Sequence, residues 1–382
     1  MQEPSTYTEA MKSPDKEQWA KAIQEELDFL KQNKVWETTP IPKDRKLIGC
    51  RWVFRIKTDA QGNLIHFKAR LVAKGYSQIK GIDYDELFAP VTRYETLRIL
   101  LALATSRKWA HRQFDVKTAF FNGDLIQIIF IEAPEGVTLS EGMCCHLHKA
   151  LYGLKQSPRE WYTCLTKFLQ SQGFERTNFD PCLFIRRNPF CLINIYVDDL
   201  FTFAEKDHHL EDIAKELSKK FEITDAGPIS FGLGINFTWT DNGLYLSQET
   251  YLKSVLTRYG FSECKTISTP LDLNITFQKG TPEESLDDIS KYQLIVRSLM
   301  YAALGTRPDL AYAVTVLSQY SSCPTETHLI AAKRVLHYVA GTIDWKLFYP
   351  RKASPSLIGY SDASYASCPD DRRSFTGNFF PT

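Results

Sequence analysis

Two adjacent aspartates are the residues of this chain whose types and spacing most suggest catalysis. Asp198 and Asp199 follow Tyr196-Val197 and lie between two apolar segments, residues 192–197 and 200–203. Two carboxylates this close in an apolar setting resist ionising together, and a bound divalent cation removes that cost. Carboxylates that share two Mg²⁺ ions about 3.5–4 Å apart are the usual device for in-line phosphoryl transfer. For an isolated Asp-Asp pair the alternative is a polar turn between two strands.

A metal site of this kind needs a third carboxylate, and Asp115 is the candidate. It lies in a predicted short strand, residues 114–117. Adjacent residues of a regular strand point to opposite faces, so a turn must bring Asp198 and Asp199 to one site. Taken alone, Asp115 would be interpreted as an ordinary residue at a strand end.

Basic residues are concentrated in the first part of the chain. The whole chain is nearly neutral, with 46 Lys+Arg, 45 Asp+Glu and a net charge of +1. Residues 31–80 nevertheless hold twelve Lys/Arg and three acidic residues. A basic region on an otherwise acidic protein suits a polyanionic partner such as nucleic acid, and a solvated charged surface is the alternative.

The elements that must position these residues follow from capping signals and hydrophobic periodicity. A first helix is predicted after Ser13, with Pro14 at its first position and an apolar face formed by Trp19, Ile23, Leu27 and Leu30. A basic β-hairpin is predicted next, with strands at 52–57 and 64–73 and a turn at 59–63.

In the rest of the chain, segments with the apolar spacing of a helix alternate with segments with the apolar spacing of a strand. Helices are predicted at 95–105, 158–171, 209–221, 295–321 and 327–339, and strands at 114–117, 128–132, 182–185, 191–197, 200–204, 235–240 and 244–247. Residues 269–290 are predicted to be a linker. This order predicts an α+β fold whose small antiparallel sheet carries helices on one face.

Composition excludes several classes of protein. Apolar residues make up 43% and charged residues 24% of the chain, which is typical of globular proteins. The apolar runs are far shorter than the roughly 20 residues of a membrane-spanning helix, so we expect no membrane partner. The N-terminus lacks a secretory signal, and nine cysteines without a Cys-x-x-Cys pair favour reduced thiols inside a cell.

Longer motifs follow one another in order along nearly the whole chain. They are residues 68–75, 81–84, 88–91, 114–123, 151–161, 196–199, 306–309 and 359–363. Together they resemble the reverse transcriptase of copia-type LTR retrotransposons, as a fragment of a Pol polyprotein. The resemblance implies a right-hand polymerase with fingers, palm and thumb and a ferredoxin-like palm sheet, followed by a connection region and a truncated ribonuclease-H-like start.

The implied domains cover the whole chain. They are an N-terminal helix at 1–34, fingers and palm at 35–248, thumb and linker at 249–290, a connection region at 291–350 and a truncated ribonuclease-H-like segment at 351–382.

The resemblance also implies roles for individual residues. Asp115, Asp198 and Asp199 would be the catalytic metal ligands, and Lys68, Arg70, Phe120 and Gln156 would bind the nucleotide. Phe120 would exclude a 2′-hydroxyl, and Lys68 and Arg70 would contact the triphosphate. Without the motif, Phe120 would be an ordinary core residue and the two cations part of a solvated hairpin face. The primer grip would comprise Phe231, Gly232, Leu233 and Gly234.

The sequence departs from the family pattern at several positions. Gly232 replaces an aromatic residue, Arg297 stands where glycine is common, and Ile128 and Ile129 stand where acidic residues are common. Asp362 would be the first metal ligand of a ribonuclease H domain, but 20 residues follow it. We therefore expect no ribonuclease H activity, and a strand at 357–360 without sheet partners.

A second possible metal motif is Cys144-Cys145-His146-Leu147-His148. His146 and His148 would share one strand face, but vicinal cysteines without a second cluster fit no usual zinc spacing. A plain strand is the preferred interpretation, and a metal-binding structural protein has only this motif in its favour.

The function implied by the family is RNA-directed DNA polymerisation with two Mg²⁺ ions, for which Mn²⁺ can substitute. The partners would be an RNA or DNA template with its primer, a dNTP and other parts of a polyprotein. The location would be intracellular, in a cytoplasmic virus-like particle and in the nucleus. The alternative is a catalytically inactive, nucleic-acid-binding remnant, which Gly232, Arg297 and the short C-terminal segment favour, whereas the retained aspartates favour an enzyme.

Overall fold

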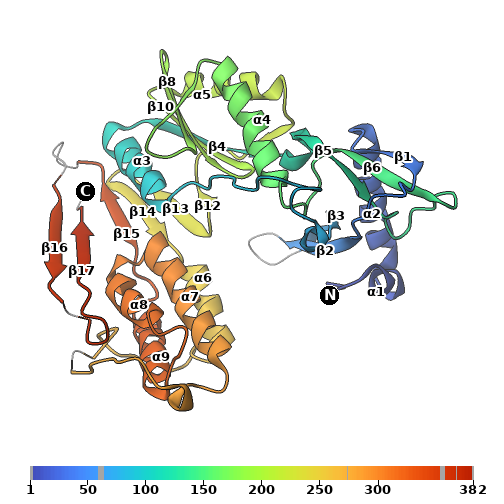
Figure 1. The fold of residues 1–382 in the computed structure, drawn as a ribbon. Helices are drawn as coiled ribbons and strands as arrows, with labels where there is room; N and C mark the ends of the chain where they lie inside the picture. Colours follow the sequence, from blue (N-terminus) through green and yellow to red (C-terminus); the bar gives the residue numbers. More distant parts are fainter. Residues whose placement is uncertain (1–2, 59–63, 273, 353–357, 367, 381–382) are drawn as a thin grey trace. The chain divides into compact units, whose positions relative to one another are not determined.

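The computed structural model describes residues 3–58, 64–272, 274–352, 358–366 and 368–380 (Figure 1). Its helices and sheets confirm the α+β prediction, and the predicted turn at 59–63 lies outside the described residues. The chain forms two compact units. The first comprises Met1–Thr92, Gln113–Thr202 and His208–Ala226, and the second comprises Arg93–Arg112, Phe203–Asp207 and Gly227–Thr382. Within the described ranges, no helix combines the length and the apolar character needed to cross a lipid bilayer.

The first unit begins with two helices, α1 (Tyr7–Lys12) and α2 (Lys16–Gln32), so the prediction of one helix starting at Pro14 is wrong in its start. Thr6 caps α1 by accepting a hydrogen bond from the Glu9 backbone. Ser13 serves the other end of α1, because its hydroxyl donates to the Ala10 carbonyl. It is therefore not available as the N-cap of α2.

The predicted basic hairpin is present as β2 (Cys50–Thr58) paired antiparallel with β3 (Leu64–Ala73). Helix α2 packs on it through Trp19, whose ring meets Phe54 and Phe67 edge-on at 5.2 and 4.6 Å. A short 3₁₀ turn, η1 (Gly75–Ser77), follows β3. The aromatic cluster fixes the hairpin to the N-terminal helix by burying apolar area on one face.

A second sheet of the first unit has the order β1 (Trp36–Pro40), β6 (Met143–Lys149) and β5 (Asp124–Ile131). Both pairings are antiparallel. The Cys144–His148 motif is thus a strand, as predicted. Leu147 and Cys145 of β6 are buried, and His146 and His148 point to the other face.

The six-stranded sheet has the order β11 (Ile223–Asp225), β4 (Ala110–Val116), β10 (Asp199–Ala204), β9 (Phe190–Tyr196), β8 (Leu183–Arg187) and β7 (Glu175–Arg176). Figure 1 shows α4 (Ser157–Ser171) and α5 (Asp207–Ser218) beside its strands. Phe221, shortly after α5, packs against Trp161 and Phe168 of α4 at 5.3 and 5.1 Å. These helices follow the apolar periodicity predicted for 158–171 and 209–221.

The second unit contains a four-stranded sheet in the order β12 (Phe231–Gly232), β13 (Ile235–Trp239), β14 (Gly243–Ser247) and β15 (Leu347–Pro350). The β13–β14 hairpin confirms the prediction made from Asn242-Gly243. Helix α3 (Tyr94–Arg107) is tied to this sheet, since the Arg98 guanidinium donates to the Tyr349 hydroxyl at 3.0 Å.

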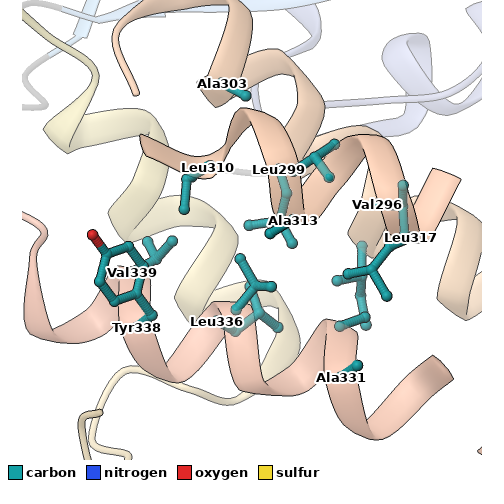
Figure 2. Close-up of a cluster of buried hydrophobic side chains, with 14 of the residues drawn as sticks. Val296, Leu299, Ala303, Leu310, Ala313, Leu317, Ala331, Leu336, Tyr338 and Val339 are labelled. Carbon is teal, nitrogen blue, oxygen red and sulfur yellow. The ribbon is translucent and has the colours of Figure 1, made fainter. Parts of the chain in front are cut away.

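The main core of the second unit lies among helices (Figure 2). They are α6 (Glu249–Tyr259), α7 (Ile289–Gly305), α8 (Ala311–Ser318) and α9 (Glu326–Gly341), with 3₁₀ turns η3 (Pro282–Glu284) and η4 (Pro308–Leu310). Figure 2 shows Leu299, Leu310 and Leu336 converging between α7, η4 and α9. The prediction of a single helix over 295–321 is wrong, because Pro308 has no N–H group and interrupts it.

Arg307, at this helix break, is a buried cation with a full set of partners. Its guanidinium donates to both carboxylate oxygens of Asp309 and to the carbonyl and hydroxyl oxygens of Thr342. Its charged carbon lies 5.7 Å from the ring centres of both Tyr338 and Trp345. The charge is stabilised by an ion pair, hydrogen bonds and aromatic faces, which together offset its desolvation.

The C-terminal segment forms a two-stranded sheet from β16 (Tyr360–Ser364) and β17 (Phe375–Phe379). The expectation that this strand would lack sheet partners is therefore wrong. Asp362 of β16 lies opposite Gly377 of β17, so the partner strand is β17. Leu357, where the strand was predicted to begin, lies outside the described residues.

His111 gives the second unit a predicted sensitivity to acid. Its ring stacks on Trp239 at 3.8 Å, and its Nδ1 accepts a hydrogen bond from the Ile229 backbone. Burial lowers the pKa of His111 to about 4, and the charge of Asp207 opposes this shift only in part.

Between pH 6.5 and about 4, His111 therefore binds a proton in the unfolded chain but not in the folded chain. We expect the free energy of unfolding to fall by about 2–3 kcal/mol as the pH is lowered through this window. Urea denaturation at stepped pH measures the loss. His111→Gln keeps an acceptor but cannot titrate, so an equal pH dependence in this variant would contradict the assignment.

Candidate active site

Asp198 and Asp199 lie at the turn between β9 and β10, where the sequence predicts a hairpin tip. Val197 has a φ of 55°, which is unusual for a β-branched residue. The Trp161 indole donates to the Val197 carbonyl at 2.6 Å, and the Val116 N–H donates to the Asp198 carbonyl at 2.9 Å. Bonds from a helix and a neighbouring strand thus hold a strained turn that carries both carboxylates.

Asp115 lies on β4, opposite Thr224 of β11. Asp115 and Asp198 both line a cavity of about 480 Å³. Asp199 is held differently, because its Oδ1 accepts a hydrogen bond from the Gln113 amide at 2.8 Å. Among the described residues the three aspartates do not form a set whose carboxylate oxygens all lie within 4.8 Å of one another. Their shared metal coordination stays a prediction.

The electrostatics of the three aspartates favour a bound cation. Burial raises the pKa of Asp115, and the charge of Asp198 raises it further. Burial also raises the pKa of Asp199, the Gln113 hydrogen bond opposes that shift, and Asp198 and Asp115 add to it. Like charges in a partly desolvated site resist ionisation, and a divalent cation would relieve both the burial and the repulsion.

Two cations face the same cavity from the basic hairpin. Lys68 and Arg70 of β3 line it together with Asp115, Asp198 and Tyr152. Burial lowers the pKa of Lys68, the neighbouring Arg70 lowers it further, and Glu26 opposes the shift. The volume lies within the range of about 300–1,000 Å³ that is usual for small-molecule sites. A pocket with carboxylates and cations suits a ligand that carries phosphates and a metal ion together.

Tyr152 and Glu26 support these cations, and neither was singled out from the sequence. The Arg70 guanidinium lies over the Tyr152 ring at 5.1 Å. Glu26 of α2 accepts from the Leu71 backbone at 3.3 Å, and burial raises the pKa of its carboxyl group. Glu26 lies seven residues after Trp19 and therefore on the predicted apolar face of the helix. An acidic residue on that face was the sequence signal that could have identified Glu26.

The hairpin and Tyr152 are joined by a close crossing of two backbone segments. The Ala73 N–H donates to the Tyr152 carbonyl at 2.7 Å. A Cβ on Gly75 would lie 2.0 Å from the Gly153 carbonyl oxygen, and one on Gly153 would lie 2.2 Å from the Ala73 carbonyl oxygen. Gly153 also has a φ of 88°. Only glycine permits this approach, which holds Arg70 and Tyr152 in one rigid assembly.

Phe120 and Gln156 lie in different surroundings. Phe120, in the 3₁₀ turn η2 (Ala119–Asn122), meets the Tyr152 ring edge-on at 4.8 Å and so borders a residue that lines the cavity. Gln156 is 1% exposed, and its amide is hydrogen-bonded to Gln78 and to the Asp83 carbonyl. Their contacts with a nucleotide stay predictions.

The predicted primer-grip residues lie in the second unit. Phe231 and Gly232 form β12, and Leu233 and Gly234, both with positive φ, make the turn into β13. The Tyr301 hydroxyl donates to the Leu233 carbonyl, which fixes this turn. Phe231 is 56% exposed, as a contact residue would be. The role of this segment at a primer stays a prediction.

Gln113, whose amide donates to Asp199, is another residue of the site that was not predicted from the sequence. It lies two residues before Asp115, and alternate residues of a strand share a face. That spacing was the signal for a polar partner of the aspartates.

The chain resembles known proteins over most of its length. The family model described as "Reverse transcriptase (RNA-dependent DNA polymerase)" matches residues 33–273. The retrovirus-related Pol polyprotein from transposon TNT 1-94 of Nicotiana tabacum is 39% identical over 99% of the chain and 29% of the relative. That from transposon RE1 of Arabidopsis thaliana is 38% identical over 98% of the chain and 26% of the relative. The chain thus spans less than a third of the length of these relatives.

Among solved structures, a foamy viral protease-reverse transcriptase in complex with double-stranded DNA aligns with a TM-score of 0.48 at 16% identity. The alignment covers 94% of this chain and 53% of that chain.

Proposed function

The chain belongs to the reverse transcriptase (RNA-dependent DNA polymerase) family, and on this premise we propose that it extends a primer with deoxynucleotides as the polymerase segment of a copia-type Pol polyprotein. The observation that carries the proposal is the cavity that Asp115 and Asp198 share with Lys68 and Arg70. Carboxylates and cations that line one cavity match a metal-bound nucleoside triphosphate.

The donor set offered by the three aspartates fits Mg²⁺. Asp115, Asp198 and Asp199 offer hard carboxylate oxygens, which Mg²⁺ prefers, and Mn²⁺ accepts the same ligands. When bound, the ion supplies positive charge that activates a hydroxyl nucleophile and neutralises phosphate oxygens. The raised pKa values of Asp115 and Asp199 support a cation at this place, since it would remove the repulsion that raises them.

The chain's own residues contribute mainly position. Arg70, held over the Tyr152 ring, and Lys68 would bind the triphosphate, the guanidinium through two parallel bonds and the ammonium as a compact charge. Glu26 compensates their charge before the nucleotide binds. The Val197 turn, held by Trp161, keeps the Asp198 carboxylate at the cavity. Catalysis by such a site rests on orientation and preorganised charge.

The wider assignments follow from the same proposal. We assign the β2–β3 hairpin to the fingers, the six-stranded sheet to the palm and the β12–β13 turn to the primer grip. The template is RNA or DNA with a paired primer, other parts of the polyprotein are partners, and the place of action is a cytoplasmic particle and the nucleus. The five-part domain division belongs to this proposal.

Template-directed incorporation of dTTP is the decisive experiment. The protein is incubated with an RNA template, a DNA primer and Mg²⁺ or Mn²⁺, beside Asp198→Asn as a matched variant. We expect metal-dependent extension by the unmutated protein and none by the variant. Equal extension by both would overturn the assignment of Asp198. Primer–template binding without extension would favour the inactive remnant, for which Gly232 and Arg297 are the motivating departures.

Phe120 provides a separate test of the nucleotide site. Phe120 contacts Tyr152, which lines the cavity, and in the proposed role its large ring would exclude a 2′-hydroxyl. We expect Phe120→Ala to reduce discrimination against ribonucleotides by about 10²-fold, because a wall that merely excludes one hydroxyl gives discrimination of this order. Competing dTTP and UTP incorporation measures the ratio. Phe179→Ala, at a residue that is 89% exposed, is the control, and unchanged selectivity in Phe120→Ala would remove the role.

A further inference from the structure

Three metal-binding side chains converge on the exposed face of the sheet formed by β1, β6 and β5. His146 and His148 come from β6, and Glu37 comes from the neighbouring strand β1. One ligand atom from each lies within 4.8 Å of the others, the one such group of three found among the described residues. None of the three takes part in the proposed polymerase site.

The strand register explains why these side chains meet. Glu37 is directly opposite His146 in the antiparallel β1–β6 pair, and His148 is two residues further along the same face. One oxygen of Glu37 lies 3.3 Å from Nδ1 of His146, and the other lies 3.5 Å from Nε2 of His148. The imidazole ring centres are 4.7 Å apart. Both rings are thus turned toward one carboxylate.

We propose that Glu37, His146 and His148 bind a divalent transition-metal ion, Zn²⁺ being the best match. Two imidazoles and a carboxylate are a known zinc donor set, which leaves one position for water. Ligand atoms of a tetrahedral zinc site with bonds of about 2.0–2.1 Å lie roughly 3.4 Å apart. The 3.3 and 3.5 Å separations, each measured from a different oxygen of Glu37, are close to that spacing. Imidazole ligands also separate this site from the oxygen-only donor set that suits Mg²⁺.

The surrounding strands hold the ligands in place. β6 is the central strand of its sheet, so its backbone is paired on both sides. Cys145 and Leu147 alternate with the histidines and are buried in the core of the first unit. The Phe130 ring of β5 packs against His146 at 5.1 Å. Ligands on paired strands lose little freedom when a metal binds, which favours affinity.

A metal-free ion pair does not account for the second histidine. A surface pair between a carboxylate and one imidazole is worth little, and it requires only one ring. Here a second ring approaches the other oxygen of the same carboxylate. Metal binding would join β1 to β6 through side chains as well as through the backbone. It would therefore stabilise the edge strand that follows the N-terminal helices.

Cobalt titration tests the proposal without reference to polymerase activity. Co²⁺ is added to the full chain in excess Mg²⁺, which occupies oxygen-only sites, and the visible absorption of tetrahedral Co²⁺ is followed before displacement by Zn²⁺. We expect one equivalent to bind. His146→Gln, His148→Gln and Glu37→Gln should each weaken binding at least about tenfold, because even residues that only orient metal ligands cost 10–100-fold when removed. His208→Gln, next to another histidine on α5, should bind as the unmutated chain does.

Thermal unfolding provides a second measurement. Zn²⁺ should raise the unfolding temperature of the unmutated chain and of His208→Gln, and the gain should be absent in the His146→Gln/His148→Gln double variant. Circular dichroism in the presence of a chelator checks that the variants fold, as their partly exposed positions predict. Absence of saturable Co²⁺ binding, or equal binding by the double variant, would overturn the proposal and leave the polymerase assignment untouched.

Discussion

Asp115→Asn is expected to abolish primer extension, with a fall in turnover on the order of 10³-fold or more. Asparagine keeps the shape of the side chain but removes one of the charges that, in the proposed function, bind the metal ion. Asp115 borders the cavity together with Asp198, Lys68 and Arg70, so the loss falls on the reacting centre. Steady-state incorporation of dTTP on an RNA template measures turnover.

The same variant should not be less stable. Burial and the charge of Asp198 both raise the pKa of Asp115, so its ionised form is destabilised in the metal-free protein. Replacing it with a neutral amide should therefore leave the unfolding temperature unchanged or higher, while primer–template affinity is retained. Asp212→Asn, whose carboxylate pairs with Lys215 at the surface of α5, is the control for loss of a charge. Extension within tenfold of the unmutated rate would exclude Asp115 as a catalytic ligand.

Arg307→Ala is expected to destabilise the second unit by about 3–5 kcal/mol. The guanidinium is 1% exposed, so truncation removes its ion pair with Asp309 and its hydrogen bonds to Thr342 from a buried site. It also removes the cation that packs against Tyr338 and Trp345. Urea denaturation followed by circular dichroism measures the change in the free energy of unfolding.

Arg258→Ala tests whether the effect is specific to the buried cation. Arg258 lies exposed on α6 of the same unit, and its removal should change stability by less than about 0.5 kcal/mol. Similar losses in the two variants, or a loss below about 1 kcal/mol in Arg307→Ala, would show that the guanidinium is not a stabilising centre of this unit.

Much of the fold could be predicted from local sequence signals. The Asn242-Gly243 turn predicts the β13–β14 hairpin, and the spacing of Trp161, Leu165 and Phe168 predicts α4. These elements have their period and their turn chemistry encoded within a few residues. The start of the first predicted helix was wrong because Ser13 can occupy either the N-terminal cap of one helix or the C-terminal end of another. In the structure it lies at the C-terminal end of α1. The predicted helical range 295–321 ran across the break at Pro308 because the apolar periodicity continues on both sides of it.

The candidate site was predictable only where a motif marks it. Asp115, Asp198, Lys68 and Arg70 carry motif signals, and the structure brings all four to one cavity. Glu26 and Tyr152 act through contacts with distant parts of the chain, which single-sequence patterns do not encode. Glu37 is the clearest case: His146 and His148 were recognised as sharing a strand face, but their partner lies on another strand, and only the pairing register reveals it.

The contact between Gly75 and Gly153 bears on how copies of such an element decay. A single base change turns a glycine codon into an alanine codon, and at either position the new methyl group would collide with a carbonyl oxygen. Such a copy would retain every acidic and basic residue that lines the cavity and still lose the close approach of the two backbone segments beside it. A survey that identifies intact genes by their aspartates alone would therefore classify such inactivated copies as intact. These two glycines provide a stricter criterion.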